Sequence, residues 1–430
     1  MNLMDLMPLW EATSNNVTKR EPLEGDRHCD VVLIGGGFSG LSTAYHLQKE
    51  GYDTVILEKD KVGGGASGRN GGQILTGFSD SMSSILEQKG IETAKAMLDM
   101  SLDSIDLISQ IIDENEISCG FHRNGHIVAA YKDSHVDKLK KEQETLKKHF
   151  DYDVDVLEKH ELSNELNSPL YRGGSVDPNS AMFHPFNYAI GLADTLEGMG
   201  GTIYEKTEAT NINHEASNKV VVSTPNGRVI AKEIVLVTNG YTSENLHKKI
   251  ARTIIPIESI MIATEQLPED VVSNLIKKNR ACFDTKNLLY YFRRTDDNRI
   301  AFGGSGRSTS KSDENNLFNN LHKGLLDVFP ELEDASIAYR WGGKVGFTRE
   351  FLPYIGRLDD GTHFAYGYAG HGAAMSTLLG KVLAENIMDN DRGFSPLEKK
   401  ELKTIPFYSQ HAKVVNLMKY YYKVLDSIKN

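Results

Sequence analysis

The feature that most constrains the fold is a glycine turn between a short apolar run and a helical segment. Residues 30–34 (Asp-Val-Val-Leu-Ile) form the run, Gly35-x-Gly37-x-x-Gly40 follows, and residues 41–50 have helical character up to Gly51. In such a turn the first glycine permits a tight bend, the second lets backbone N–H groups approach a pyrophosphate, and the third lets the helix pack closely on the sheet. The segment therefore predicts a strand, turn and helix that bind a dinucleotide.

A carboxylate at the end of the next strand narrows the kind of dinucleotide. Residues 54–57 (Thr-Val-Ile-Leu) predict a second strand, and Glu58 closes it, 23 residues after Gly35. A carboxylate at this place accepts hydrogen bonds from free ribose hydroxyls and repels a phosphorylated ribose. A GxGxxG match alone can arise by chance in a glycine-rich loop, but here the strand, the helix and the terminal acid are all in order.

A second glycine-rich segment, residues 63–73 (Gly-Gly-Gly-Ala-Ser-Gly-Arg-Asn-Gly-Gly-Gln), follows soon after. Its backbone donors, with Ser67, Asn70 and Gln73, suit a long ligand that runs past the pyrophosphate toward a ring system. The alternative interpretation is a flexible surface loop. Beside the first turn, the segment favours FAD over NAD.

Composition excludes several other classes of protein. A chain of 430 residues exceeds what one hydrophobic core usually serves, so two domains are expected. The net charge of −11 argues against nucleic acid as a partner, because phosphate binding needs a basic face. Cys29, Cys119 and Cys282 form no CxxC pair, so we expect no disulfide framework, no metal site and a cytoplasmic location. No run of 18 apolar residues and no signal peptide are recognised, so no transmembrane segment is expected.

Four regions of the chain resemble the D-amino-acid oxidase superfamily of flavoproteins, which includes glycine, sarcosine and γ-glutamylputrescine oxidases. The first region comprises the turn, Glu58 and residues 65–73. The others are residues 235–241 (Val-Leu-Val-Thr-Asn-Gly-Tyr), 340–348 (Arg-Trp-Gly-Gly-Lys-Val-Gly-Phe-Thr), and 353–356 with 367–372 (Gly-Tyr-Ala-Gly-His-Gly). Their order and spacing match the superfamily over most of residues 28–390.

The resemblance implies noncovalent FAD and a set of contact residues. The expected cofactor contacts are Gly35, Gly37, Phe38, Ser39, Gly40, Glu58, Lys59, Ala66, Ser67, Arg69, Asn70, Gly71, Gly72, Gln73, Ala209, Thr238, Asn239, Gly240, Gly343, Gly370, His371, Gly372 and Ala373. The expected catalytic residues are Gln73, Trp341, His371 and Tyr290. His371 is equally compatible with a packing role. Tyr290, Tyr291 and Trp341 could form aromatic walls of the substrate pocket, but aromatic residues at such spacing are also typical of a core.

Two departures from the superfamily bear on the substrate. Relatives that oxidise amino acids hold the substrate carboxylate with an Arg, which would fall on Val345 here, or a Lys, which would fall on Ala374. Arg69, Arg293 or Arg349 remain possible replacements. A Cys that tethers flavin in sarcosine oxidases would fall on Gly343, which favours noncovalent FAD.

The closest pattern is the γ-glutamylputrescine oxidase branch, which shares a short N-terminal arm like Leu9-Trp10-Glu-Ala-Thr13. The resemblance implies oxidative deamination of a primary or secondary amine by hydride transfer to flavin N5, with oxygen as the electron acceptor. The products would be an aldehyde, ammonia or a smaller amine, and hydrogen peroxide. An FAD-dependent oxidase or dehydrogenase of glycine, N-methylated or D-amino acids, and a catalytically idle FAD-binding interaction protein, stay open as alternatives.

The expected fold is α/β (α+β): a Rossmann-type FAD-binding domain with an inserted antiparallel-sheet substrate domain. The FAD domain is assigned residues 28–110, 155–245 and 340–390, and the substrate domain residues 111–154 and 246–339. Residues 1–27 are expected to form a loose arm, and residues 391–430 a C-terminal tail whose aromatic residues have no assigned role.

Overall fold

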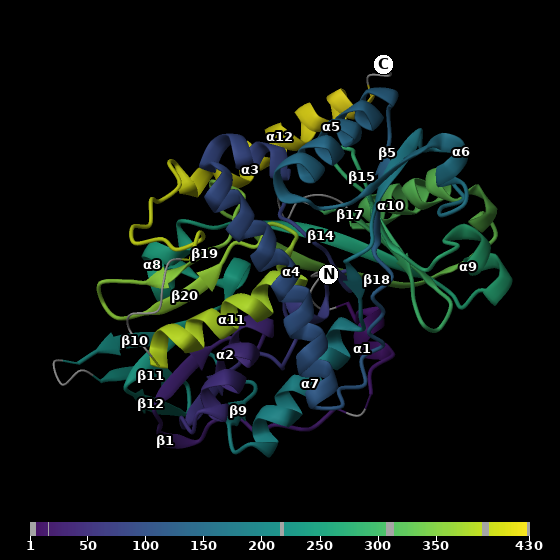
Figure 1. The fold of residues 1–430 in the computed structure, drawn as a ribbon. Coiled ribbons are helices and arrows are strands. Elements are labelled where there is room, and N and C mark those ends of the chain that lie inside the picture. The colour runs from purple at the N-terminus through teal and green to yellow at the C-terminus, as the bar shows by residue number, and fades with distance from the viewer. Residues whose placement is uncertain (1–5, 16, 216–218, 307–313, 389–394, 428–430) are drawn as a thin grey trace.

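The computed structural model describes residues 6–15, 17–215, 219–306, 314–388 and 395–427. Two large sheets dominate it. One sheet, with its helices, occupies the lower left of Figure 1, and the other extends to the upper right. The first sheet holds the glycine turns, and the second contains most of the region assigned to the substrate domain, so the arrangement confirms the expected fold class.

The first large sheet has six strands with the chain's opening strand near its centre. Their order is β19 (Tyr354–Arg357), β20 (His363–Tyr366), β13 (Glu233–Leu236), β2 (Val31–Ile34), β3 (Thr54–Leu57) and β9 (Thr202–Tyr204). Every neighbouring pair is parallel except β19 with β20. All four residues of β2 and of β3 are buried, because a parallel sheet of this kind is covered on both faces.

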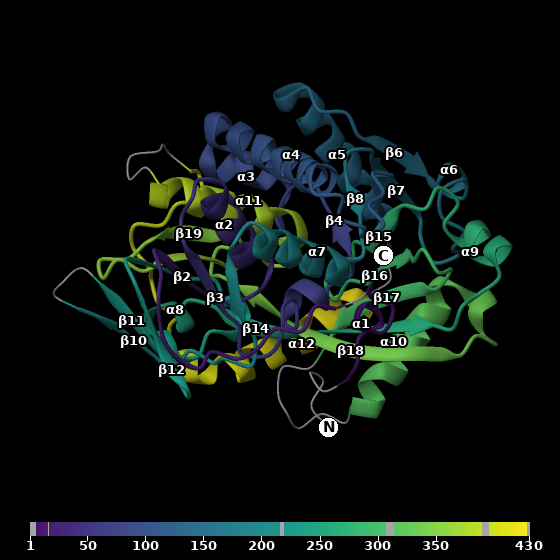
Figure 2. The ribbon, with the colours of Figure 1, turned by 90° about the horizontal axis from the view of Figure 1, so that it is seen from below.

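Alternating residues of β2 face two different layers. Val31 and Leu33 pack with helices α2 (Phe38–Lys49), α4 (Ile91–Glu114), α7 (Pro185–Gly198) and α11 (Gly372–Met388). Val32 and Ile34 pack on a four-stranded sheet in the order β1 (Gly25–His28), β12 (Gly227–Ala231), β11 (Val220–Thr224) and β10 (Asn211–His214). Figure 2 shows the helices on one side of β2 and β3 and the small sheet on the other.

The second large sheet has eight strands. Their order is β18 (Ile337–Phe347), β14 (Ile255–Thr264), β17 (Ile300–Ser305), β16 (Tyr291–Arg294), β15 (Ala281–Asp284), β5 (His126–Ala130), β7 (Gly173–Asp177) and β6 (Asp155–Glu158). It is antiparallel except between β5 and β15. Ile260, Ile262 and Phe302 on one face pack with α10 (Glu314–Val328). A two-stranded ladder joins β4 (Gln73–Ile74) to β8 (Ala181–Met182).

The remaining elements are shorter or lie at the edges. They are helices α1 (Leu9–Ala12), α3 (Met82–Lys89), α5 (Asp133–Phe150), α6 (Lys159–Leu162), α8 (Glu244–Ala251), α9 (Glu269–Leu275) and α12 (His411–Ser427), and the 3-10 turns η2 (Ala66–Gly68), η3 (Asn239–Tyr241), η4 (Pro330–Leu332) and η5 (Tyr408–Gln410). Among the described helices, none combines the length and the apolar character needed to cross a membrane.

The structure differs from the sequence expectations at three places. Helix α2 begins at Phe38, three residues earlier than expected, because Gly37 serves as its N-cap. The arm is not loose: α1 is packed in the core and β1 pairs with β12. Strands β6 and β7 and residues 340–347 of β18, from segments assigned to the FAD domain, lie in the eight-stranded sheet. The division into domains stays a prediction.

Candidate functional site

The first glycine turn has no room for side chains. A Cβ at Gly40 would lie 2.0 Å from the carbonyl oxygen of Gly35, and one at Gly37 would lie 2.8 Å from Ser67 Oγ. Gly35 itself has a φ of +116°, in the region that favours glycine. The backbone at the start of α2 therefore forms an open cradle, as the motif predicts, and its helix dipole favours an anion there.

Glu58 lies beside this cradle. Its two carboxylate oxygens accept hydrogen bonds from the backbone N–H groups of Gly36 and Asp60, each at 2.8 Å. Burial raises the pKa of the Glu58 carboxyl, although the two backbone donors favour its ionised form. These contacts fix the carboxylate at the end of β3, where the sequence placed an acceptor for ribose hydroxyls.

The second glycine loop folds back on the first. Ser67 Oγ accepts a hydrogen bond from the N–H of Phe38 at 3.0 Å, and Asn70 Nδ2 donates to the carbonyl oxygens of Ala66 and Ser67. Gly68 must be glycine, because a Cβ there would lie 2.4 Å from the oxygen of Gly63. The loop is thus a structured wall beside the cradle and not a flexible surface segment.

Two later segments complete the same wall. Ser39 Oγ lies 2.6 Å from Tyr368 Oη, which joins the first turn to the last glycine cluster. Asn239 Oδ1 accepts a hydrogen bond from the N–H of Gly367 at 2.9 Å, which joins η3 to that cluster. The N–H of Lys344 also donates to Tyr241 Oη at 3.1 Å, so the four sequence regions converge in space, although more than 300 residues separate Ser39 from Tyr368.

A cavity of about 1650 Å³ runs from the cradle to the floor of the eight-stranded sheet. Most of the expected contact residues line it: Gly35, Gly37, Phe38, Ser39, Glu58, Lys59, Ala66, Ser67, Arg69, Asn70, Gly71, Gln73, Ala209, Thr238, Asn239, Gly343, Gly370, His371, Gly372 and Ala373. Gly40, Gly72 and Gly240 are not among the lining residues. Gly40 and Gly72 instead allow close packing behind the wall, where a Cβ would meet backbone oxygens at 2.0 and 2.5 Å.

Two of the four expected catalytic residues lie away from the cavity. Trp341 is fully buried, donates from Nε1 to the carbonyl oxygen of Arg69 at 3.0 Å, and meets Trp10 edge to face. Tyr290 packs against Phe302 in the core beneath the sheet. Direct contact of these two side chains with a ligand is not supported by their positions.

Of the two adjacent tyrosines that could form an aromatic wall, Tyr291 and not Tyr290 faces the cavity. It lines the cavity, and its Oη lies 2.9 Å from Ser259 Oγ. A Cβ at Gly303 would lie 2.1 Å from the Tyr291 ring, so the ring lies flat across its neighbouring strand. The one-residue difference has a simple cause, since successive side chains of a strand point to opposite faces.

Gln73 and His371 do line the cavity. Gln73 Nε2 donates to the carbonyl oxygens of Cys282 and Phe292, which anchors the second glycine loop to the sheet. His371 stands just before α11, and its Nδ1 is buried with no partner among the described residues. Burial lowers the pKa of His371 to about 4, so its imidazole is neutral at physiological pH.

Several cavity residues were missed by sequence reasoning. One group, from β5, β7 and the turn after α5, includes His126, Tyr152 and Asp177. Tyr152 Oη donates to the Asp177 carboxylate at 2.8 Å, and burial lowers the pKa of His126. Another group, Val415, Met418, Lys419 and Tyr422, comes from α12 in the C-terminal tail. No local motif marks either group, because only the tertiary fold brings them to the cavity.

The residues present fit a flavin dinucleotide. The cradle accepts a pyrophosphate because side chains are excluded from it, Glu58 offers oxygen acceptors, and the N-termini of α2 and α11 both border the cavity. The cavity continues past the cradle to Gln73, Tyr291 and His371, which leaves space for a ring system and a substrate. These features define an FAD-dependent oxidoreductase.

Comparisons with known proteins agree with this class. The family model described as "FAD dependent oxidoreductase" (DAO) matches residues 30–386, and the chain belongs to this family. Its members that resemble this chain act on C–N bonds of amines and amino acids.

Individual relatives match nearly the whole chain. A probable oxidoreductase, OrdL, of Haemophilus influenzae is 35% identical over 388 residues, covering 89% of this chain and 88% of its own. The γ-glutamylputrescine oxidoreductase of Escherichia coli is 34% identical over 376 residues, covering 87% of each chain. The crystal structure of glycine oxidase from Geobacillus kaustophilus superposes with a TM-score of 0.73 at 22% identity, covering 85% of this chain and 96% of its own. At this low identity, the similarity to glycine oxidase shows a shared fold.

Proposed function

We propose that the protein is an FAD-dependent amine oxidase that deaminates a primary or secondary amine similar to γ-glutamylputrescine. Oxygen would reoxidise the flavin, and the products would be an aldehyde, ammonia or a smaller amine, and hydrogen peroxide. The similarity to the Escherichia coli γ-glutamylputrescine oxidoreductase supports this substrate class. FAD is proposed to be noncovalent, since Gly343 stands where some relatives carry a tethering Cys. The cytoplasmic location stays a prediction.

The observation that carries the proposal is the apolar side chain at the expected carboxylate clamp. Val345 lines the cavity at the end of β18, and Ala374 is buried in α11, so neither position offers a cation. Arg69 and Arg293 are committed elsewhere. Arg69 donates to the carbonyl oxygens of Gly64 and Gly342, and Arg293 to those of Gly72 and Phe183. These contacts favour an uncharged carbon chain near Val345, while the third candidate, Arg349, lines the cavity at the turn after β18.

The chain's own residues have distinct parts in such a reaction. When bound, FAD supplies the acceptor for a hydride that leaves the carbon beside the substrate nitrogen. Gln73 fixes the second glycine loop to the sheet floor, and the Tyr291–Ser259 pair forms part of that floor. His371 remains neutral because it is buried, so it adds no positive charge that would repel an incoming ammonium group. The amino group of the substrate must be neutral before hydride transfer, whether it binds in that form or loses a proton after binding.

Anaerobic mixing with γ-glutamylputrescine followed by admission of air tests the proposal. Bleaching of the flavin absorbance, and its rapid return with one hydrogen peroxide per turnover, is the expected result. Lack of bleaching rejects this substrate, and slow return in air favours a dehydrogenase. Bleaching by glycine, an N-methylated amino acid or a D-amino acid instead would favour the amino-acid alternative. A flavin inert to all amines and to sulfite would favour the idle FAD-binding protein.

A further inference from the structure

The C-terminal helix α12 forms one wall of the cavity, beside one end of four central strands of the eight-stranded sheet. Strands β14 and β16 begin at this end, and β15 and β17 finish there. Val415, Met418, Lys419 and Tyr422 of α12 line the cavity here, opposite Ser305 of β17. The substrate chamber is therefore incomplete without a segment that lies beyond the region matched by the family model.

The position of α12 is fixed by polar contacts near its C-terminal end. Asp426 accepts hydrogen bonds from the backbone N–H groups of Asn287 and Leu288, both at 3.0 Å, and from Asn287 Nδ2 at 2.7 Å. Lys132 Nζ, just before α5, donates to the carbonyl oxygen of Leu425 at 3.2 Å. Because Asn287 and Leu288 also line the cavity, the same contacts couple the helix to the chamber wall.

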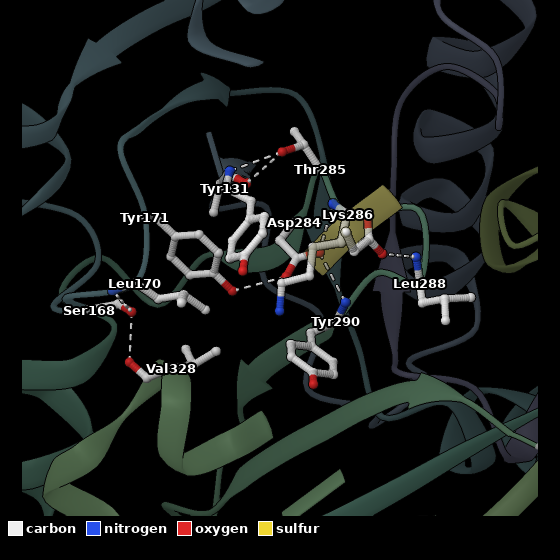
Figure 3. A network of polar contacts seen from close by, with 12 residues as sticks. Tyr131, Ser168, Leu170, Tyr171, Asp284, Thr285, Lys286, Leu288, Tyr290 and Val328 are labelled. Carbon is white, nitrogen blue, oxygen red and sulfur yellow. Dashed lines mark hydrogen bonds and ion pairs between the residues drawn. The ribbon is translucent and has the colours of Figure 1, made fainter. Parts of the chain in front are cut away.

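A buried network holds the loop on which α12 rests (Figure 3). Lys286 Nζ lies 3.9 Å from the centre of the Tyr290 ring, 4.7 Å from that of Tyr131, and 3.7 Å from the Asp284 carboxylate. Asp284 also accepts a hydrogen bond from the N–H of Tyr290 at 3.1 Å, and Tyr171 Oη donates to it at 3.3 Å. None of these side chains lines the cavity. The network therefore makes the loop a firm base for α12.

Lys419 brings a positive charge to the wall of the chamber beside the end of β17. Its Nζ donates to the carbonyl oxygen of Gly306 at 2.6 Å, at the end of β17. An ammonium group has three N–H donors, so this contact leaves two for a ligand. Burial lowers the pKa of Lys419 to about 8 while the nearby Glu258 opposes the change, so the group is still mostly charged at pH 7.

We propose that Lys419 binds a carboxylate carried by the far end of the amine substrate, while the reacting amine lies deeper in the chamber. The inference rests on the proposed function. A half-buried ammonium that holds a carboxylate gives a stronger contact than a fully solvated pair. The interior has Val345 where a clamp was expected, so the charge on Lys419 selects the length of the substrate and its carboxylate-bearing end, and the wall of α12 sets where that end lies.

The test compares two amines that differ at the far end: γ-glutamylputrescine, which carries an α-carboxylate and an α-ammonium group there, and N-acetylputrescine, which carries neither. Lys419→Met should lower kcat/KM for γ-glutamylputrescine about 10- to 100-fold, mainly through KM, since a charged hydrogen bond is lost. The value for N-acetylputrescine should change less than about twofold. Lys419→Arg should restore most of the difference, and Lys423→Met, on the exposed face of the same helix, should change neither substrate.

A binding measurement separates recognition from turnover. Calorimetric binding of γ-glutamylbutylamide, which has the carboxylate but no reacting amine, should weaken in Lys419→Met and not in Lys423→Met. Equal losses for both amines would mean that Lys419 only holds α12 against Gly306. A carboxylate-specific loss in Arg349→Met alone would place the binding cation at the turn after β18. Either result overturns the inference. If the unmodified protein oxidises neither amine but binds γ-glutamylbutylamide through Lys419, the proposed function fails and the site stands.

Discussion

The two ends of the chain lie outside the matched family region, yet they are held in opposite ways. At the N-terminus, Leu9 and Trp10 are 1% and 2% exposed, and Trp10 Nε1 donates to the carbonyl oxygen of Asn70 in the second glycine loop. At the C-terminus, Val415 is the one fully buried residue among those described in α12, while Leu417 and Tyr420 are each 70% exposed. The first end is part of the core beneath the cofactor loop, and the second is a cover attached by polar contacts. Changes at the first should affect folding and FAD, and changes at the second should affect substrate.

The largest effect is expected at Trp10. Trp10→Ala removes a buried ring that meets Trp341 and His184, so the free energy of unfolding should fall by about 3–5 kcal/mol. FAD occupancy should fall too, because the support of Asn70 is lost. Urea unfolding and the ratio of flavin to protein absorbance measure the two effects. The matched change at the other end, Tyr420→Ala, should leave both unchanged, and a comparable loss there would break the comparison.

Part of the pH dependence of the free energy of unfolding should come from His184, which contacts the N-terminal segment. His184 Nδ1 accepts the N–H of Asn187 at the start of α7, its Nε2 lies 3.1 Å from Thr13 Oγ1, and burial lowers its pKa to about 4. The unfolded chain binds this proton near pH 6.5, so stability is lost as the pH falls from about 6.5 to 4, by about 2–3 kcal/mol for this group.

Urea unfolding measured between pH 4 and 7 checks this effect. His184→Gln should reduce the slope of unfolding free energy against pH in that window. Part of the slope should remain, because the pKa values of His46 and His371 are also lowered to about 4. A protein that ends before α12 should keep nearly the whole slope. If that truncation removed the slope instead, the groups responsible would lie in or against α12 and not near the N-terminal segment.

At the C-terminal end a smaller change in stability should accompany a larger change in mobility. Asp426→Ala removes three hydrogen bonds to Asn287 and Leu288, and the free energy of unfolding should fall by about 1 kcal/mol. Trypsin should then cleave within α12 several times faster, while FAD content stays constant. Asn416→Ala, at an exposed position of the same helix, is the control. Unchanged cleavage would show that Asp426 does not hold α12 in place.

The smallest effect is expected on the outer face of α12. Leu417→Ser should change the free energy of unfolding by less than about 0.5 kcal/mol, because Leu417 is 70% exposed. Thermal unfolding of the variant and the unmodified protein measures the difference. A loss above 2 kcal/mol would mean that this face is covered in solution, and the two ends would then be alike.

The sequence predicted the cofactor half of the molecule well, for a physical reason. Gly35, Gly40 and Glu58 are required by contacts within one strand, turn, helix and strand, so their spacing alone carries the geometry. The substrate half was predicted only as a sheet. Which of Tyr290 and Tyr291 faces the cavity depends on strand register, and a run of adjacent aromatic residues does not reveal it.

The two ends of the chain were the least predictable parts. Nothing local in residues 25–28 signals that they pair with β12, nor in residues 411–427 that they form a chamber wall, because both contacts join segments more than 100 residues apart. Trp341 was expected at the site on family resemblance, but packing against Trp10 places it behind the wall. Lys419 lies in no motif at all.

The long sequence separation of the cradle's parts has a consequence for the synthesis of the protein. Of the cradle's parts, β2 and β3 are synthesised early, β13 begins only at residue 233, and Gly372 at the start of α11 comes late in the sequence. Until that segment has emerged, the early segments lack two contacts that close the cradle: the hydrogen bond between the Ser39 and Tyr368 hydroxyl groups, and the one that the N–H of Gly367 donates to Asn239 Oδ1. We therefore expect the complete cofactor cradle to form only after residue 368 has been synthesised, since its last contacts come from that segment.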